Sequence, residues 1–203
     1  MKRNSQRRLI PVLTGILSLG LGSVSSIAQA ESASAVFHFA ATLISGSCVI
    51  SAPASLQFNG GNTLFGADIE AAGMEGSSAT TVQFNLILQN CTGWGGTPRI
   101  VVSGQQYNDI NFRLFRDADA LGIMDSVGYG VLLKTAGNSS FNENTNLAVD
   151  GNISVKNWSM NTQLNTLNNT LPITAILSCG DCANVGRHGG KFQATVIFDF
   201  VYE

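Results

Sequence analysis

The chain has 203 residues, with 11 Lys and Arg side chains against 13 Asp and Glu. A formal net charge of −2 leaves no basic patch of the kind that binds nucleic acid or anionic lipid, so we exclude both classes of partner. Sparse charge and abundant Gly, Ser, Asn and Thr are typical of an extracellular sheet protein, and the length suits one domain with a hydrophobic core.

The first thirty residues have the three parts of a secretory signal peptide. A basic start is followed by an apolar run over residues 9–21 and by the small-residue site Ala28-Gln29-Ala30. The run is shorter than the roughly 20 residues that a bilayer needs, which disfavours the alternative of a membrane anchor. We therefore predict a signal peptide over residues 1–30 and no membrane insertion of the mature chain, whose net charge is −6.

Short alternating or apolar runs, separated by Gly, Asn, Asp and Ser, occupy the mature chain. They cover residues 35–45, 80–90, 97–104, 110–117, 129–135, 153–160, 171–178 and 191–202. Residues 64–74 leave room for a turn or two of helix, and the polar, Asn-rich residues 137–152 are expected on the surface. Seven or eight short strands predict an all-β sandwich with Greek-key connections.

The last run alternates most strictly. Its apolar side chains share one face of the predicted strand: Phe192, Ala194, Val196, Phe198, Phe200 and Tyr202. A strand needs a neighbour along each edge, and nothing follows this one in the sequence. The pattern therefore raises the question of what pairs with its second edge.

Four cysteines follow the predicted signal peptide, and an even number in an oxidising compartment favours disulfides. Three pairings are possible. We favour Cys48 with Cys91 and Cys179 with Cys182, because a separate near pair leaves the distant pair to cross-link two strands.

Residues that carry chemistry are few. His38 lies in an alternating segment, on the face opposite Phe37 and Phe39, and His188 lies in a Gly-rich turn. Neither has further metal ligands at a suitable spacing, and no nucleophile elbow, phosphate loop or dinucleotide motif is present. We expect no enzyme activity, no metal and no cofactor. Core packing or loop anchoring is the favoured interpretation of Trp94, with a ligand groove as the alternative.

The pair Cys179 and Cys182, in the segment "CGDC", is the exception. A redox Cys-x-x-Cys motif follows a strand and precedes a helix, whose N-terminus lowers the pKa of the first thiol. Here a second strand-like run follows. We interpret the pair as a staple in a hairpin connection, and a thiol oxidoreductase remains an alternative.

Four segments in order resemble the chaperone-usher pilins, the subunits of type 1-like and P-like fimbriae of Gram-negative bacteria. "FHFAATLISGSCVI" is similar to the first strand of the family leading into its first cysteine, and "VQFNLILQNC" to the strand leading to the second. "SVGYGVLLKTAGNSSF" resembles a segment of small residues, hydrophobic strand and polar turn. The ending, with Gly190, alternating apolar residues and a penultimate Tyr202, is the most specific match.

The resemblance implies an incomplete immunoglobulin-like β-sandwich that is completed by a donor strand from another subunit, a known form of strand addition. It divides the chain into a signal peptide over residues 1–30, a donor extension over residues 31–42, and a pilin domain over residues 37–203 that overlaps the extension. A periplasmic chaperone would first lend a strand, and the extension of a neighbouring pilin would later replace it. An outer-membrane usher would export the subunit to the cell-surface fimbrium.

The resemblance also implies site residues. The donor face would consist of Ala33, Ala35, Phe37, Phe39 and Ala41. The acceptor groove and chaperone contact would involve Gly190, Phe192, Ala194, Val196, Phe198, Phe200, Tyr202 and Glu203, with the terminal carboxylate held by basic chaperone residues. Phe37 and Phe39 are alternatively core residues of this subunit's own first strand. A short Ala- and Ser-rich donor and the "CGDC" pair depart from the family pattern.

The favoured function is therefore a structural subunit, major or minor, of a fimbrium that supports adhesion. A tip adhesin is disfavoured because the chain has room for one domain only. The alternative from another class is a self-contained secreted or periplasmic β-sandwich that binds a ligand.

Overall fold

The computed structural model describes residues 46–107, 112–117 and 125–203, which lie within one compact unit. The strands are β1 (Gly46–Ser51), β2 (Thr81–Gly93), β3 (Pro98–Gly104), β4 (Gln106–Tyr107), β5 (Leu114–Phe115), β6 (Gly130–Lys134), β7 (Asn152–Ser154), β8 (Asn169–Ser178) and β9 (Val196–Tyr202). The helices are η1 (Phe58–Gly61), α1 (Gly66–Ala72), α2 (Leu147–Asp150) and η3 (Leu164–Leu167). The all-β prediction is confirmed.

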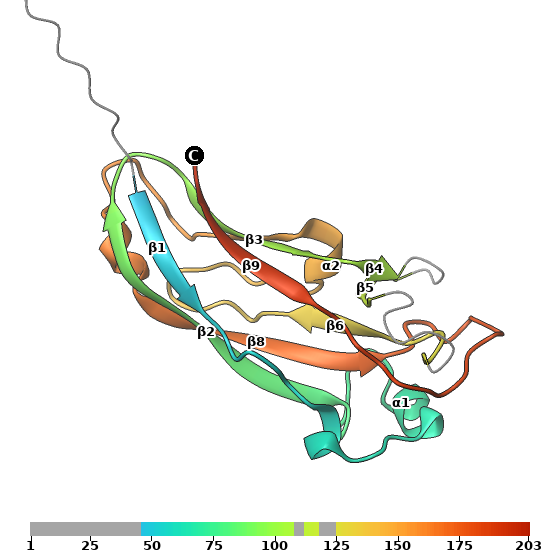
Figure 1. The fold of residues 1–203 in the computed structure, drawn as a ribbon. Helices are drawn as coiled ribbons and strands as arrows, with labels where there is room; N and C mark the ends of the chain where they lie inside the picture. The colour runs from blue at the N-terminus through green and yellow to red at the C-terminus, as the bar shows by residue number, and fades with distance from the viewer. Residues whose placement is uncertain (1–45, 108–111, 118–124) are drawn as a thin grey trace, which may run out of the picture. The chain divides into compact units, whose positions relative to one another are not determined.

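Two antiparallel sheets contain these strands (Figure 1). The larger has the order β1-β2-β8-β6-β5-β4 and the smaller the order β7-β3-β9. Most neighbouring strands are far apart in sequence, so the connections cross between the sheets. Strand β1 ends one sheet and β9 ends the other, and the two end strands lie side by side (Figure 1).

The core lies between the sheets because alternate side chains of each strand point to one face. Leu86 and Leu88 of β2 and Ile100 of β3 are buried there, together with residues of β6 and β8. Expected strands over residues 80–90, 97–104, 129–135 and 171–178 correspond to β2, β3, β6 and β8. The short helix expected within residues 64–74 is α1.

A bulge carries Cys91 into this core. The pairing of β1 with β2 shifts register between Ser47 and Val49, and Asn90 has a φ of +54°. An extra residue in one strand reverses the alternation beyond it, so that Cys91, rather than Asn90, points inward. Cys91 forms a disulfide with Cys48 and thereby ties the edge strand β1 to β2.

Three predicted strands differ from the observed ones. Of residues 110–117, only Leu114–Phe115 form a strand among the described residues, and β7 ends at Ser154 instead of residue 160. The final strand begins at Val196, not at residue 191, because β3, its ladder partner, ends opposite Val196 at Gly104. The run expected over residues 35–45 lies outside the described residues, while the strand that contains Cys48 begins at Gly46.

The prediction that residues 137–152 lie on the surface is wrong for four of them. Gly137 is buried, and Phe141, Leu147 and Ala148 are buried in the main core. The side chain of Asn146 caps α2 by accepting a hydrogen bond from the backbone N–H of Ala148 at 3.0 Å. Three of the apolar side chains of this polar loop are therefore part of the main core.

Among the described residues, none of the helices has the length and hydropathy needed to cross a bilayer.

Candidate functional site

An open groove of about 810 Å³ runs beside the first half of β9. One wall is formed by residues 189–190 and 192–196 together with Phe198, and the other by residues 52–58 and 61–64. We call this the β9 groove. Five of the expected acceptor residues line it: Gly190, Phe192, Ala194, Val196 and Phe198.

The floor of the β9 groove is the hydrophobic core itself. It consists of Phe84 of β2, Val131 and Leu133 of β6, and Ala175 and Leu177 of β8. Phe84 is only half-buried although it points inward, whereas Leu86, two residues along the same strand, is 0% exposed. The sandwich is therefore closed around Leu86 and open around Phe84.

The wall formed by β9 and its preceding residues has apolar side chains that are only partly covered. Phe192, Ala194, Val196, Phe198, Phe200 and Tyr202 all pack against the core, and all remain half-buried, while the intervening residues up to Asp199 are exposed. The predicted alternation is confirmed, including its continuation before the start of the ladder. A strand that faced a complete core would bury such side chains fully.

The backbone of this wall has one paired edge and one free edge. In antiparallel strands the N–H and C=O groups of alternate residues point to the same neighbour. Glu203 exchanges both backbone hydrogen bonds with Thr97, and the carbonyl of Gln193 accepts from the N–H of Asp117 at 3.0 Å. The backbone N–H and C=O groups of odd-numbered residues from 193 to 203 thus point toward β3 or Asp117. Those of the even-numbered residues point toward the groove.

The opposite wall supplies no partner for that free edge. Strand β1 ends at Ser51, and Pro53, which has no N–H, follows. Residues 52–57 are exposed and lie in no strand, and η1 then turns the chain through left-handed Asn59 and Gly60. Within the described residues, the second edge of β9 is therefore unpaired.

The remaining expected acceptor residues lie at the closed end, where the tips of β1 and β9 meet. A Cβ added to Gly46 would lie 2.9 Å from the ring of Tyr202, so the two strands touch there. The hydroxyl of Tyr202 accepts from the N–H of Gly96 at 2.9 Å. Glu203 forms two side-chain hydrogen bonds with Arg99, at 2.8 and 3.1 Å. Phe200, Tyr202 and Glu203 thus extend the strand beyond the groove.

Two residues that sequence reasoning missed support the open end of the groove. Arg116 is buried, and its guanidinium lies 5.8 Å from the ring centre of Phe192 and donates to the backbone carbonyls of Ser126 and Tyr129. Asp117 accepts from the N–H and the hydroxyl of Thr195, at 2.9 and 2.7 Å. Their only signal in the sequence is a pair of charges ending the apolar run at residues 110–117.

The pKa of Asp117 lies below its ordinary value. Partial burial acts to raise it, but hydrogen bonds from the hydroxyl and N–H of Thr195 and from the side chain of Gln193 together outweigh that effect. The charged carboxylate of Asp117 is therefore the form that accepts these hydrogen bonds from the groove wall.

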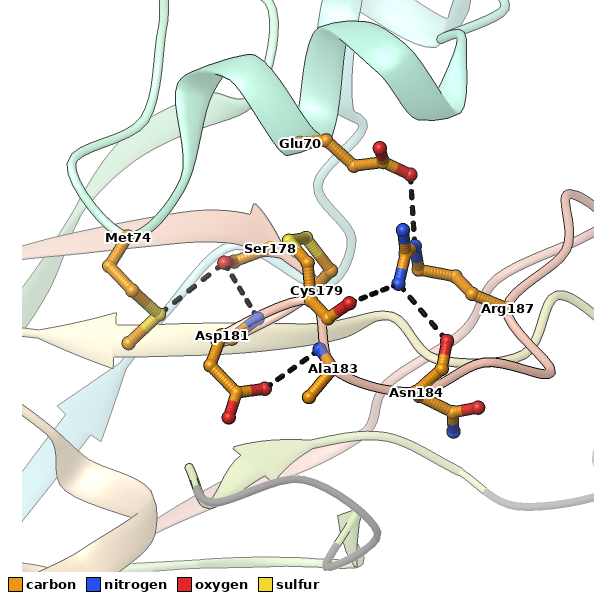
Figure 2. Close-up of a disulfide and its surroundings, with 10 residues drawn as sticks. Glu70, Met74, Ser178, Cys179, Asp181, Ala183, Asn184 and Arg187 are labelled. Atoms are coloured by element: carbon orange, nitrogen blue, oxygen red, sulfur yellow. Dashed lines mark hydrogen bonds and ion pairs between the residues drawn. A yellow bond between two sulfur atoms is a disulfide. The ribbon is translucent and has the colours of Figure 1, made fainter.

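The disulfide between Cys179 and Cys182 closes the turn after β8, as expected for a staple (Figure 2). The N–H of Cys182 donates to the carbonyl of Cys179 at 3.1 Å, and the residues that follow form turns instead of a helix. Arg187 bonds the carbonyl of Cys182 at 2.5 Å and Glu70 of α1 at 2.9 Å, and this bond to Glu70 raises the pKa of Arg187. The stapled turn is thereby fastened to α1.

The other candidates lie elsewhere. His188 is exposed, and its backbone pairs with Val127 in an isolated bridge. Trp94 is 63% exposed and lies outside the groove, with its backbone bridged to Gln163. The donor residues Ala33, Ala35, Phe37, Phe39 and Ala41, together with His38 and the signal peptide, lie outside the described residues. Among the described residues, no three metal-ligating side chains are grouped together.

Among the solved structures that the chain matches is the P pilus rod subunit PapA, with 19% identity and a TM-score of 0.47, over 81% of this chain and 97% of that one. No family model and no curated protein sequence matches the chain.

Proposed function

We propose that this chain is a non-enzymatic structural subunit of a chaperone-usher fimbrium and assembles by accepting a strand from a neighbouring subunit. The observation that carries the proposal is the β9 groove, in which a partly exposed core floor lies beside a strand with a free backbone edge. An inserted strand satisfies both features at once, since its backbone pairs with β9 and its side chains cover the floor.

The segment 31–42 of a second copy suits this groove in length and pattern. Its apolar face extends over nine residues, from Ala33 to Ala41, and the groove-lining part of the β9 wall extends over ten, from Gly189 to Phe198. Strands rise by about 3.3 Å per residue, so the two spans differ in length by one residue's rise. Burying Phe37 and Phe39 would contribute about 1.5 to 3 kcal/mol each.

Before assembly, an unpaired apolar edge is prone to nonspecific pairing, and this is the hazard that a periplasmic chaperone would remove by lending a strand. The predicted signal peptide directs the chain to that compartment, and an outer-membrane usher would export it to the surface fimbrium, where it would support adhesion. The free edge of β9 would thus accept a strand twice, first from the chaperone and then from a neighbouring subunit.

A self-contained ligand-binding sandwich is the competing function, because about 810 Å³ is also within the size range of small-molecule pockets. A small ligand, however, leaves the strand edge of β9 without backbone partners. The two functions differ in whether the mature monomer is complete.

The test compares the mature chain, residues 31–203, with a version in which residues 32–43 are moved behind Glu203 through a short linker. We expect the rearranged chain to be a stable monomer and the unaltered chain to polymerise or to unfold more easily. The matched control is the rearranged chain with Phe37→Ser and Phe39→Ser, which keeps the linker and removes the apolar anchors. Equal and reversible melting of the unaltered and rearranged chains would reject the subunit role.

A further inference from the structure

We infer that Asp117 is a positioning residue that takes the place of a strand beside residues 193–195 and so extends the strand-accepting edge beyond β9. The inference rests on the proposed function, because it concerns the edge that the donor would pair with. The side chain of Asp117 would support residues 193–195 of the groove wall, which no ladder supports.

The ladder of the smaller sheet stops partway along the β9 groove. Gly104, the last residue of β3, pairs with Val196, the first residue of β9. A Cβ added to Gly104 would lie 2.6 Å from the carbonyl oxygen of Thr195, so the two backbones are already in close contact there. Beyond this point the chain leaves β3 for β4, which belongs to the other sheet. Among the described residues, Lys191 has an isolated bridge with Asp125, and its carbonyl accepts from the N–H of Ser126 at 2.8 Å. Residues 192–195, between this bridge and β9, have no strand along their inner edge in the described part of the chain.

Asp117 supplies the missing bonds at the next two inward-facing positions. Its backbone N–H donates to the carbonyl of Gln193 at 3.0 Å, and its carboxylate accepts from the N–H of Thr195 at 2.9 Å. A strand partner would make these same two backbone bonds. The hydroxyl of Thr195 and the side chain of Gln193 add further bonds to the carboxylate, at 2.7 and 3.3 Å.

The position of Asp117 is itself held by its neighbour. The N–H of Arg116 donates to the carbonyl of Gln105 at 2.9 Å, and its buried guanidinium bonds the carbonyl of Tyr129 at 3.0 Å. The carboxylate of Asp117 is thus presented from a fixed backbone. This arrangement preorganises the wall before a donor arrives.

The consequence appears on the opposite edge. Because Gln193 and Thr195 bond inward to Asp117, Phe192 and Ala194 present their N–H and C=O groups to the groove. Their side chains, like those of Val196 and Phe198, continue the half-buried alternation. Asp117 therefore extends the groove-lining edge from Val196 and Phe198 of β9 to Ala194 and Phe192.

Hydrogen–deuterium exchange at single-amide resolution tests this role. The mature chain is measured with and without a synthetic peptide of residues 31–42, as wild type and as Asp117→Ala. In the wild type, we expect the peptide to slow exchange at Phe192, Ala194, Val196 and Phe198. In Asp117→Ala, Val196 and Phe198 should respond as before, while the peptide-induced slowing at Phe192 and Ala194 should fall at least about tenfold, because a charge-assisted clamp is lost.

Two further variants separate positioning from general destabilisation. Thr195→Val removes only the hydroxyl bond and should reduce the slowing at Phe192 and Ala194 by a smaller factor. Asp150→Ala, at an exposed carboxylate in α2, should leave the peptide-induced slowing of exchange unchanged at all four amides. Full slowing at all four amides in Asp117→Ala would overturn the inference and leave the proposed function intact. No slowing at any of the four amides in the wild type would overturn both.

Discussion

The rings of Phe84 on β2 and Phe198 on β9 meet edge to face, with their centroids 6.2 Å apart. Each ring comes from a different sheet, and both line the β9 groove. The pair therefore joins the two sheets at the place where the core is open to solvent.

Replacing Phe84 by Ala should destabilise the rearranged, donor-filled chain more than the unaltered chain. We expect a loss of about 3 kcal/mol in the filled form, where the donor completes the burial of the ring, and a smaller loss in the open form. Urea unfolding of both forms measures the difference. Phe65→Ala, at a side chain that is 70% exposed, is the control and should change the free energy of unfolding by no more than about 0.5 kcal/mol. Equal losses at Phe84 in the two forms would contradict this prediction.

Of two adjacent residues of β9, only one should affect assembly when it is replaced by lysine. Val196→Lys places an ammonium on the groove side, where an incoming strand would have to bury it, and assembly should fall by at least about tenfold. Ile197→Lys places the same group on the outer face, where Ile197 is 54% exposed, and assembly should be unchanged. Sedimentation of the mature chain at matched concentrations measures both. Loss of assembly with Ile197→Lys but not with Val196→Lys would contradict this prediction, because it would place the subunit contact on the outer face of β9.

Asp117 should make the stability of the groove wall depend on pH. Its pKa in the folded protein is below its ordinary value, so its contribution is complete above the unfolded pKa of about 3.9 and disappears as the pH falls through the folded value. The difference in free energy of unfolding between wild type and Asp117→Asn should therefore be constant near neutral pH and shrink below about pH 4. Urea titrations from neutral to strongly acidic pH measure this, and a difference that grows on acidification would refute it.

The two disulfides should differ in their contribution to stability. Cys48–Cys91 closes a loop with a sequence separation of 43, which is worth about 4 kcal/mol in the chain-entropy account. Cys179–Cys182 closes a separation of 3, worth about 2 kcal/mol. Urea midpoints of the two double Cys→Ala variants should therefore fall in that order. A larger loss for the short-range pair would show that the stapled turn supports much more of the fold than its own loop.

Short-range sequence patterns predict much of the fold of this protein. The alternation of Phe192 to Phe200 and of Phe84 to Leu88 determines which side chains face inward, because consecutive residues of any strand point to opposite faces. The pairings of Cys48 with Cys91 and of Cys179 with Cys182 were favoured among three possibilities from the number and spacing of the cysteines, and the alternation predicted which residues of the β9 wall face inward.

Only the tertiary structure decided where β9 begins, what forms the second wall, and which side chain replaces the missing ladder. A ladder requires a partner from elsewhere in the chain, so the end of β3 at Gly104 sets the start of β9 at Val196. The bulge that turns Cys91 inward and the burial of Phe141 inside a polar loop likewise depend on contacts between distant segments. Asp117 looks like any surface carboxylate in the sequence, because its role comes from Thr195, which only folding brings within reach.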